Sequence, residues 1–187
     1  MLYTKKGDDG KTKIFGCDQR ISKSSAIAEA LGCLDEANSF LGICKVFSKN
    51  ELVQSSKSKV KSKFNISEII HRVQNNLFVI QAQVAGADKK INVDEIKYIE
   101  KVINDIEKEL PPIKTFLISG ANEMSANFDF ARTLARRAER RVVAVSEEGI
   151  TKIDSQTLTF LNRLSSLLYA FARYSAKESG AEIAPKY

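Results

Sequence analysis

The sequence has little of what most metal, redox and membrane proteins need. Its 187 residues contain no tryptophan, three prolines, a single histidine (His71) and three cysteines. Cys17, Cys33 and Cys44 show no CxxC spacing, so we expect reduced, structural thiols and no zinc or other metal site. No apolar run approaches the ~20 residues of a membrane span, and the N-terminus has no signal-peptide pattern. We therefore expect a cytoplasmic protein without a membrane partner.

Positive charge is in excess, but it is concentrated in one stretch. The net charge is +6, and residues 55–64 contain four lysines and no acid. Without those four lysines the net charge falls to +2. Such a balance does not support a broad electrostatic surface for nucleic acid, so we expect no nucleic-acid partner. We interpret residues 49–64 as a Lys/Ser-rich loop.

Apolar residues recur at helical spacing in five segments. We expect helices at residues 24–47, 66–87, 93–109, 122–147 and 154–179. Ser24 or Ser25 can cap the first helix. Short connections and the lack of strand alternation predict an all-α five-helix bundle, with an up-and-down four-helix core of the ferritin-like type and an N-terminal loop segment. The length predicts a single domain over residues 1–187.

The expected fourth helix contains five arginines within residues 132–141. It also has an apolar seam for packing, formed by Phe128, Ala131, Ala135, Ala138, Val142 and Val145. Arg132, Arg136 and Arg140 form a separate row at i, i+4 and i+8, where like charges repel by roughly 0.2–0.5 kcal/mol per pair. An anion against the row would offset this repulsion, and the arginine fork suits phosphate. The alternative is a solvated basic face.

Glycines punctuate the N-terminal segment, residues 1–23. Gly7 and Gly10 lie among lysines and threonines, and together with backbone N–H groups these side chains supply donors for phosphate. The triplet Gly10-Lys11-Thr12 is not a P-loop, because two residues rather than four separate its glycine from Gly7. The segment predicts either a phosphate-contacting loop of another kind or a frayed, lysine-rich terminus.

The first and last helices also have polar side chains beside their apolar stripes. The last helix has a polar stripe made of Asn162, Ser166, Tyr169 and Arg173. Asn162 could offer its amide to a ligand, and the alternative is an exposed polar face. On the first helix, whose stripe we expect to include Val46, Asp35 lies at the edge. A carboxylate there pairs with a base within the fold or across an interface, or stays in water.

Several stretches together resemble the PduO-type ATP:cob(I)alamin adenosyltransferases. The first resembles the family pattern YTRTGDxG, the central one ARxxxRRAER, and the last FLNRLSDxLFxxAR. The matching stretches are, in order, YTKKGDDG (3–10), SKS (22–24), EALGCLDE (29–36), LPP (110–112), FLI (116–118), ARTLARRAER (131–140), FLNRLS (160–165) and FARY (171–174). They cover almost the whole chain, and their joint occurrence is far more specific than any one of them.

The resemblance implies a trimeric five-helix bundle that transfers the 5′-deoxyadenosyl group of ATP to the cobalt of reduced cobalamin, with Mg²⁺ present, and releases triphosphate. ATP would lie between subunits, under an N-terminal segment that becomes ordered on binding. Arg132 would be catalytic and pair across the interface with Asp35, and Phe116 would displace the lower axial ligand of Co(II)-cobalamin. The implied nucleotide contacts are Thr4, Lys5, Lys6, Gly7, Thr12, Lys13, Lys23, Arg136, Arg137, Ala138, Glu139, Arg140 and Asn162.

The implied chemistry needs no protein base, because cob(I)alamin is itself a nucleophile. The protein would hold C5′ in line with cobalt and stabilise charge on the departing triphosphate. ATP with Mg²⁺ and cobalamin are the expected substrates. A reductase and a B12-dependent enzyme are candidate protein partners.

The chain departs from the family pattern at several positions. Ser119-Gly120-Ala121 replaces the PGG that ends the family stretch LPPLxxFILPGG, and Asp129 replaces the histidine of many members. Ser166 replaces the aspartate of FLNRLSD, and Lys5 replaces the arginine of YTRTGDxG. These departures motivate a second hypothesis, a non-catalytic helical bundle that binds ATP or cobalamin as a sensor or carrier.

Overall fold

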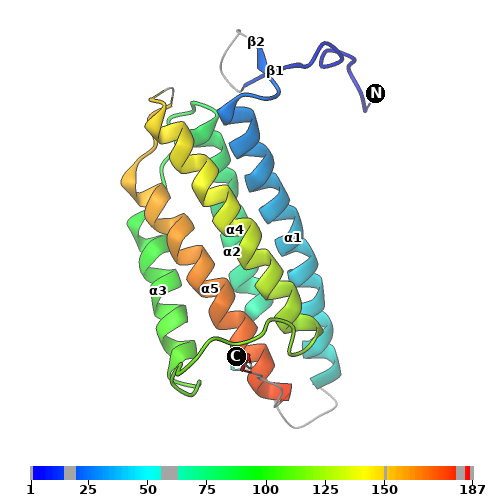
Figure 1. The fold of residues 1–187 in the computed structure, drawn as a ribbon, viewed down its shortest axis with the longest axis vertical. Coiled ribbons are helices and arrows are strands. Elements are labelled where there is room, and N and C mark those ends of the chain that lie inside the picture. Colours follow the sequence, from blue (N-terminus) through cyan, green and yellow to red (C-terminus); the bar gives the residue numbers. More distant parts are fainter. Residues whose placement is uncertain (1, 15–19, 56–62, 150, 180–183, 186–187) are drawn as a thin grey trace.

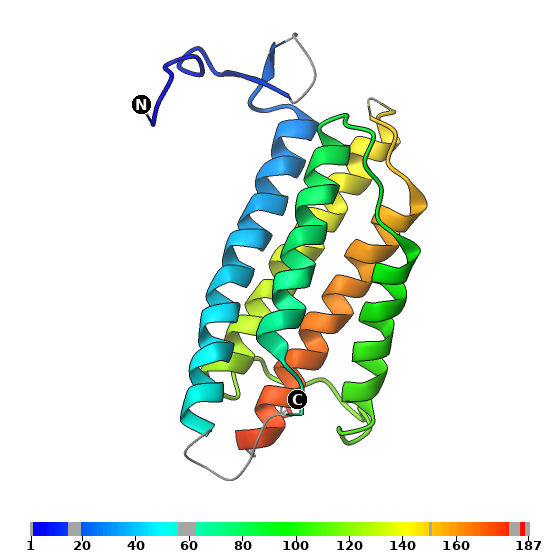
Figure 2. The ribbon, with the colours of Figure 1, turned by 180° about the vertical axis from the view of Figure 1, so that it is seen from behind.

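The computed structural model describes residues 2–14, 20–55, 63–149, 151–179 and 184–185, and five helices dominate them. The helices are α1 (Ala26–Ser55), α2 (Ile66–Val84), α3 (Val93–Glu107), α4 (Glu123–Glu147) and α5 (Ser155–Ser179). Figures 1 and 2 show α1, α2, α4 and α5 side by side as an up-and-down bundle, with α3 against α5. The expected all-α bundle is confirmed. None of the described helices combines the length and apolar composition needed to cross a membrane.

All five helices contribute to the apolar core. The seam predicted on α4 is buried along its whole length, from Phe128 to Val145. Phe128 meets Phe171 of α5 with ring centroids 5.2 Å apart. Burying a large apolar side chain stabilises a fold by roughly 1.5–3 kcal/mol. The seam therefore holds α4 in place and fixes the direction in which its arginines point.

Four of the five helices end within three residues of the expected positions, but α1 is longer. It begins after Ser25, whose Oγ accepts a hydrogen bond from the backbone N–H of Ala28 at 3.3 Å. It then continues to Ser55. The loop predicted for residues 49–64 is therefore wrong for residues 49–55, which are helical, and residues 56–62 lie outside the described part of the chain.

Two side chains differ from their expected burial. Val46 was expected in the core and is 57% exposed. Arg173 was expected on a polar stripe and is only 6% exposed. Its Nη2 donates to the Pro111 carbonyl at 3.1 Å, where the connection between α3 and α4 crosses α5 (Figure 1). Arg173 therefore anchors that connection to the bundle.

The N-terminal segment contains a short hairpin that the sequence did not predict. Strand β1 (Lys11–Lys13) pairs antiparallel with β2 (Arg20–Ser22), with Lys13 opposite Arg20. Strands of three residues are too short for an alternation of apolar and polar side chains to appear. Figure 1 shows the hairpin beyond the end of the bundle where α1 begins.

Candidate active site

The N-terminal loop holds many of the expected nucleotide contacts, and it folds back on itself. The Gly10 N–H donates to the Gly7 carbonyl at 3.2 Å, and the Lys23 N–H donates to the Gly10 carbonyl at 2.9 Å. Gly10 has a φ of 76°, in the left-handed region that favours glycine. The Lys23 Nζ donates to the Gly7 carbonyl at 2.8 Å. Lys5 and Lys6 are exposed, so the loop presents ammonium groups to an anion.

The loop also contains the two threonines expected to contact nucleotide. Thr4 is exposed, and its Oγ1 accepts a hydrogen bond from the Lys6 N–H at 3.4 Å. Thr12 is half-buried in β1, beside Lys13. The loop therefore gathers hydroxyl, ammonium and backbone N–H donors within one short segment.

The five arginines of α4 divide into two groups. Arg137 pairs with Glu36, and Arg141 pairs with Glu29, its Nε 3.4 Å from Oε1. Both acids come from α1, so these pairs connect two helices. Arg136 is exposed, and among the described residues its guanidinium has no hydrogen-bond or ionic partner. Within the row of Arg132, Arg136 and Arg140, the guanidinium of Arg136 is therefore accessible to a ligand.

Arg132 begins that row and is partly buried. Its Nε lies 3.9 Å from the Oδ1 of Asp129, which is too long for a hydrogen bond. Arg140 ends the row and donates its Nη1 to the Arg136 carbonyl at 3.0 Å. Ala138 is fully buried in the apolar seam, and its expected nucleotide contact stays a prediction.

Two of the expected nucleotide contacts, Asn162 of α5 and Glu139 of α4, lie side by side. The Asn162 Nδ2 donates to the Glu139 Oε1 at 3.0 Å, and the Arg163 Nη1 donates to the Asn162 Oδ1 at 2.9 Å. These two partners fix the orientation of the amide. Two stretches that are distant in the sequence therefore meet on one surface.

A cleft of about 710 Å³ brings together Phe116, Arg132 and Arg136. The connection between α3 and α4 forms one wall, and Ser165, Ser166 and Tyr169 of α5 form another. Phe116 is 80% exposed. A large aromatic face therefore stands beside two guanidinium groups at a single opening.

Three of the positions that depart from the family pattern lie at this cleft. Ser119, Asp129 and Ser166 line it. The Ser119 hydroxyl and the Gly120 N–H are potential donors beside the Asp129 carboxylate. Burial raises the pKa of Asp129, and these donors and the charge of Arg132 oppose the shift. The departures therefore alter the polar lining of a cleft that also contains Phe116 and Arg132.

Asp35 lies on the exposed surface of α1. Within the described ranges it has no ionic partner, and the carboxylate nearest Arg132 is that of Asp129. The pairing of Asp35 with Arg132 across a subunit boundary stays a prediction.

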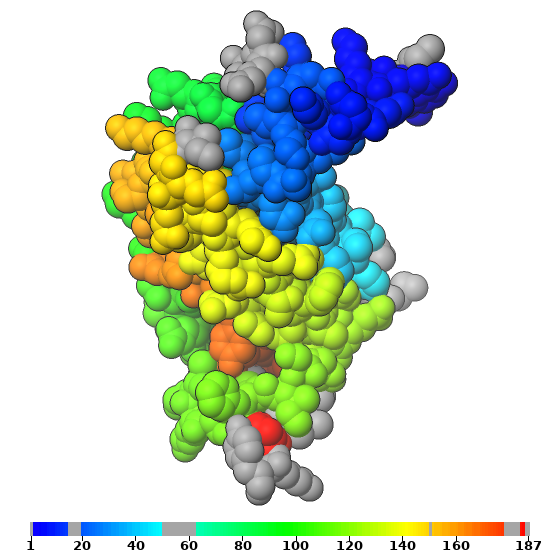
Figure 3. Space-filling view, turned by 45° about the horizontal axis from the view of Figure 1, so that its top comes forward, coloured from blue at the N-terminus to red at the C-terminus, as the bar shows by residue number. Residues whose placement is uncertain are grey.

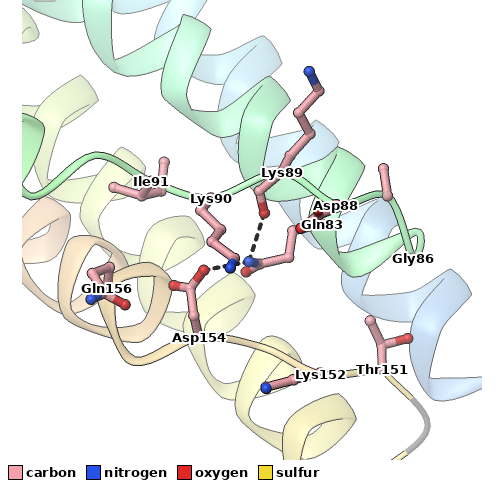
Figure 4. A pocket seen from close by; sticks show the side chains of 11 residues that line it. Gln83, Gly86, Asp88, Lys89, Lys90, Ile91, Thr151, Lys152, Asp154 and Gln156 are labelled. Carbon is pink, nitrogen blue, oxygen red and sulfur yellow. Dashed lines mark hydrogen bonds between the residues drawn. The ribbon is translucent and has the colours of Figure 1, made fainter.

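A second hollow of about 710 Å³ lies at the other end of the bundle, between the α2–α3 and α4–α5 connections (Figure 4). The Nε2 of Gln83 donates to the Lys89 carbonyl at 2.8 Å and to the Oδ2 of Asp154 at 2.5 Å. The Oδ1 of Asp154 accepts from the Thr157 N–H at 2.8 Å, at the start of α5. None of the expected site residues lines this hollow, and its polar groups tie helix ends together.

The two halves of the expected site lie on different parts of one chain. Figure 1 shows the N-terminal segment at one end of the bundle and the α3–α4 connection at the other. Figure 3 shows the N-terminal segment projecting sideways as a separate lobe. Nothing in the described chain folds this lobe over the cleft.

The chain is similar to known proteins over most of its length. A family model described as cobalamin adenosyltransferase matches residues 2–175. The corrinoid adenosyltransferase PduO of Citrobacter freundii is 34% identical over 92% of the chain, which covers 49% of that protein. The corrinoid adenosyltransferase of Bacillus subtilis is 32% identical, with 96% of the chain and 88% of that protein covered. The chain thus spans about half the length of the PduO relatives and most of the length of other relatives.

A solved structure extends the similarity to the fold. It is a variant PduO-type ATP:corrinoid adenosyltransferase from Lactobacillus reuteri, complexed with cobalamin and ATP. The TM-score is 0.81 and the identity 29%, covering 100% of this chain and 99% of that one. The chain therefore belongs to the cobalamin adenosyltransferase family.

Proposed function

We propose that the protein transfers the 5′-deoxyadenosyl group of ATP to the cobalt of cob(I)alamin, giving adenosylcobalamin and triphosphate. The observation that carries the proposal is the cleft that combines the exposed face of Phe116 with Arg132 and Arg136. An apolar face suits the corrin side, and guanidinium groups suit the triphosphate side. The cobalamin and ATP bound by the Lactobacillus reuteri relative support the same pair of substrates.

In the proposed reaction the cobalt electron pair of cob(I)alamin attacks C5′ of ATP. The cobalt–carbon bond forms as the C5′–O bond breaks, and the bonding electrons of C5′–O leave with triphosphate. Arg136 stabilises the charge that grows on the leaving group, and Asn162, held by Glu139, orients the nucleotide. ATP brings Mg²⁺ on its phosphates.

Phe116 has a different role. A water or imidazole ligand below cobalt makes Co(II)-cobalamin harder to reduce, and an apolar ring in that position excludes such a ligand. Phe116 is exposed at the cleft and therefore available to contact the corrin. This role makes the cleft the cobalamin side of the site.

We further propose a homotrimer with ATP at the subunit interfaces. The N-terminal lobe of one chain, with its lysines, would cover the arginine row of a neighbour, and Asp35 of one chain would pair with Arg132 of the next. The separation of the two half-sites on one chain supports this proposal. Cytoplasmic location and a reductase or B12-dependent enzyme as partner remain predictions of the same kind.

The direct test is adenosylcobalamin formation from ATP and chemically reduced cobalamin, followed by the change in visible absorbance. We expect turnover that requires ATP and Mg²⁺. Purified protein that neither turns over nor binds ATP would contradict the proposal.

A second candidate is a non-catalytic sensor or carrier of ATP or cobalamin. The changed polar lining at Ser119, Asp129 and Ser166 favours it, because these residues share the cleft with Phe116. Tight binding of ATP and cobalamin without any product would select this candidate over the enzyme.

A further inference from the structure

Arg20 is the most highly connected side chain of the N-terminal lobe, and no expected function includes it. It lies on β2 opposite Lys13 and reaches back over the loop. Its Nη1 donates to the Oδ2 of Asp9 at 2.8 Å, and its Nη2 donates to the Oδ1 of Asp9 at 2.7 Å. The same Nη2 donates to the Lys11 carbonyl at 3.1 Å and to the Lys6 carbonyl. One guanidinium thus joins β2 to three points of the loop.

These bonds determine which atoms the loop offers to a ligand. The Oδ1 of Asp9 also accepts from the Lys11 N–H at 3.1 Å, so the carboxylate is shared between Arg20 and the backbone. Carbonyl oxygens repel phosphate oxygens. Because Arg20 binds the Lys6 and Lys11 carbonyls, those two oxygens are not free to face an anion.

Arg20 is poorly placed to bind phosphate itself. Its bidentate pairing with Asp9 offsets its charge and uses both terminal nitrogens. Lys5, Lys6 and Lys11 are exposed, and no carboxylate among the described residues pairs with them. The Arg20–Asp9 pair is also partly exposed, 35% and 51% for the two side chains, so it adds little to the stability of the bundle.

We propose that Arg20 is a positioning residue: its fork on Asp9 and its bonds to the Lys6 and Lys11 carbonyls hold the N-terminal loop in the shape that receives the triphosphate of ATP. This inference rests on the proposed function. Removing either member of the Arg20–Asp9 pair releases the loop and weakens ATP binding without changing the cobalamin side.

The experiment compares Arg20→Ala, Asp9→Ala and the double variant with the unaltered protein. We expect each single variant to raise the KM for ATP by about tenfold, as for the loss of one charge-assisted hydrogen bond. The double variant should have a KM for ATP no higher than that of either single variant, because each single substitution already removes the Arg20–Asp9 pair. The KM for cobalamin and the kcat at saturating ATP should change by less than about twofold. The melting temperature should change by no more than a few degrees. ATP dissociation constants measured without cobalamin should follow the KM for ATP.

Lys97→Ala serves as the matched control, because it removes one exposed positive charge on α3, far from the lobe in the sequence. Unchanged KM for ATP in Arg20→Ala would overturn the inference. So would Asp9→Ala behaving like the unaltered protein while Arg20→Ala loses affinity, since Arg20 would then contact phosphate directly. If the unaltered protein neither binds ATP nor turns over, the proposed function fails and this role fails with it.

Discussion

At the scale of single residues, the arginines of α4 have two different environments. Arg137 and Arg141 face carboxylates of α1, whereas Arg136 faces solvent without a partner among the described residues. Repulsion within the helix is therefore relieved on one side by the fold. On the other side it persists, and a bound anion would relieve it. Arg136 is thus the residue whose removal should affect ligand more than fold.

We expect Arg136→Ala to lower kcat/KM for ATP by about 10²–10³-fold, the usual cost of losing a donor to developing negative charge. The helical circular dichroism signal and the melting temperature should not change, because the side chain is exposed. Arg141→Ala is the control: it removes the same charge from the same helix but only an exposed pair with Glu29. Equal losses of activity in both variants would show that only the general charge of α4 matters.

Spacing and resemblance made Arg136 and Asn162 candidate ligand contacts, but the sequence could not assign their neighbours. Whether an arginine beside the row is free or paired depends on which helix packs against it, and Glu36 comes from a helix about a hundred residues away. Ala138 shows the same limit. Its place in a motif suggested a nucleotide contact, whereas its place in the apolar seam decided its burial.

At the scale of elements, Asp154 joins the start of α5 to the end of α2. It caps α5 through the Thr157 N–H and holds the amide of Gln83, which is 4% exposed. We expect Asp154→Ala to destabilise the protein by about 1–3 kcal/mol, from the lost cap and an unsatisfied buried donor. Urea denaturation measures this change. Asp88→Ala, exposed in the same hollow, should stay within about 0.5 kcal/mol. A similar loss in both variants would contradict the assignment.

An ion pair between Arg72 of α2 and Glu95 of α3 joins these two helices, and we expect its contribution to stability to depend on pH. Arg72 donates to both carboxylate oxygens of Glu95 at 2.7 and 2.8 Å, Asn76 donates to Glu95 at 2.8 Å, and the Arg72 guanidinium lies 3.7 Å from the ring centre of Tyr98. Hydrogen bonds from Arg72 above all, and from Asn76, hold the pKa of Glu95 below its ordinary 4.5, although burial opposes them. The carboxylate therefore stabilises the fold above 4.5, and this contribution disappears as pH falls through the lowered value.

We accordingly expect Glu95→Gln to be less stable than the unaltered protein by about 1 kcal/mol near neutral pH. The difference should vanish once pH falls below the pKa of Glu95 in the folded protein, because both side chains are then uncharged. Denaturation curves at a series of pH values measure it. A difference that persists unchanged in acid would mean that packing rather than charge is responsible.

The elements themselves were predictable to different degrees, for physical reasons. The seam of α4 followed from periodicity alone, since apolar side chains at spacings of three and four must share a face. The end of α1 did not, because the Lys/Ser-rich composition suggested a loop, whereas no glycine or proline lies between Gly42 and Ser55, where the helix ends. Arg173 needed the tertiary structure, since only the crossing of the α3–α4 connection provides its Pro111 partner.

At the scale of the whole molecule, rigid helices hold apart the two parts of the proposed site. The N-terminal lobe extends from the start of α1, and the α3–α4 connection, which forms one wall of the cleft, lies at the other end of the bundle (Figure 1). Long packed helices do not bend enough to close that separation. A second copy can supply the missing half without any change in the bundle, which is why symmetric assembly is the simplest completion of the site.

Mixing two inactive variants tests this arrangement directly. Asp35→Asn and Arg132→Ala should each lose most of their activity while their subunits keep their melting temperature. In a proposed trimer that contains both, an interface formed by Asp35 of one chain and Arg132 of the other is intact. With random assembly from equal amounts, about a quarter of the interfaces regain both residues, so co-expression should restore about a quarter of the original activity. Trimers carrying two different affinity tags can be purified to prove that the subunits mixed. If such mixed trimers stay inactive, Asp35 and Arg132 do not act as a pair between subunits, because only a pair formed across the boundary can be rebuilt by mixing.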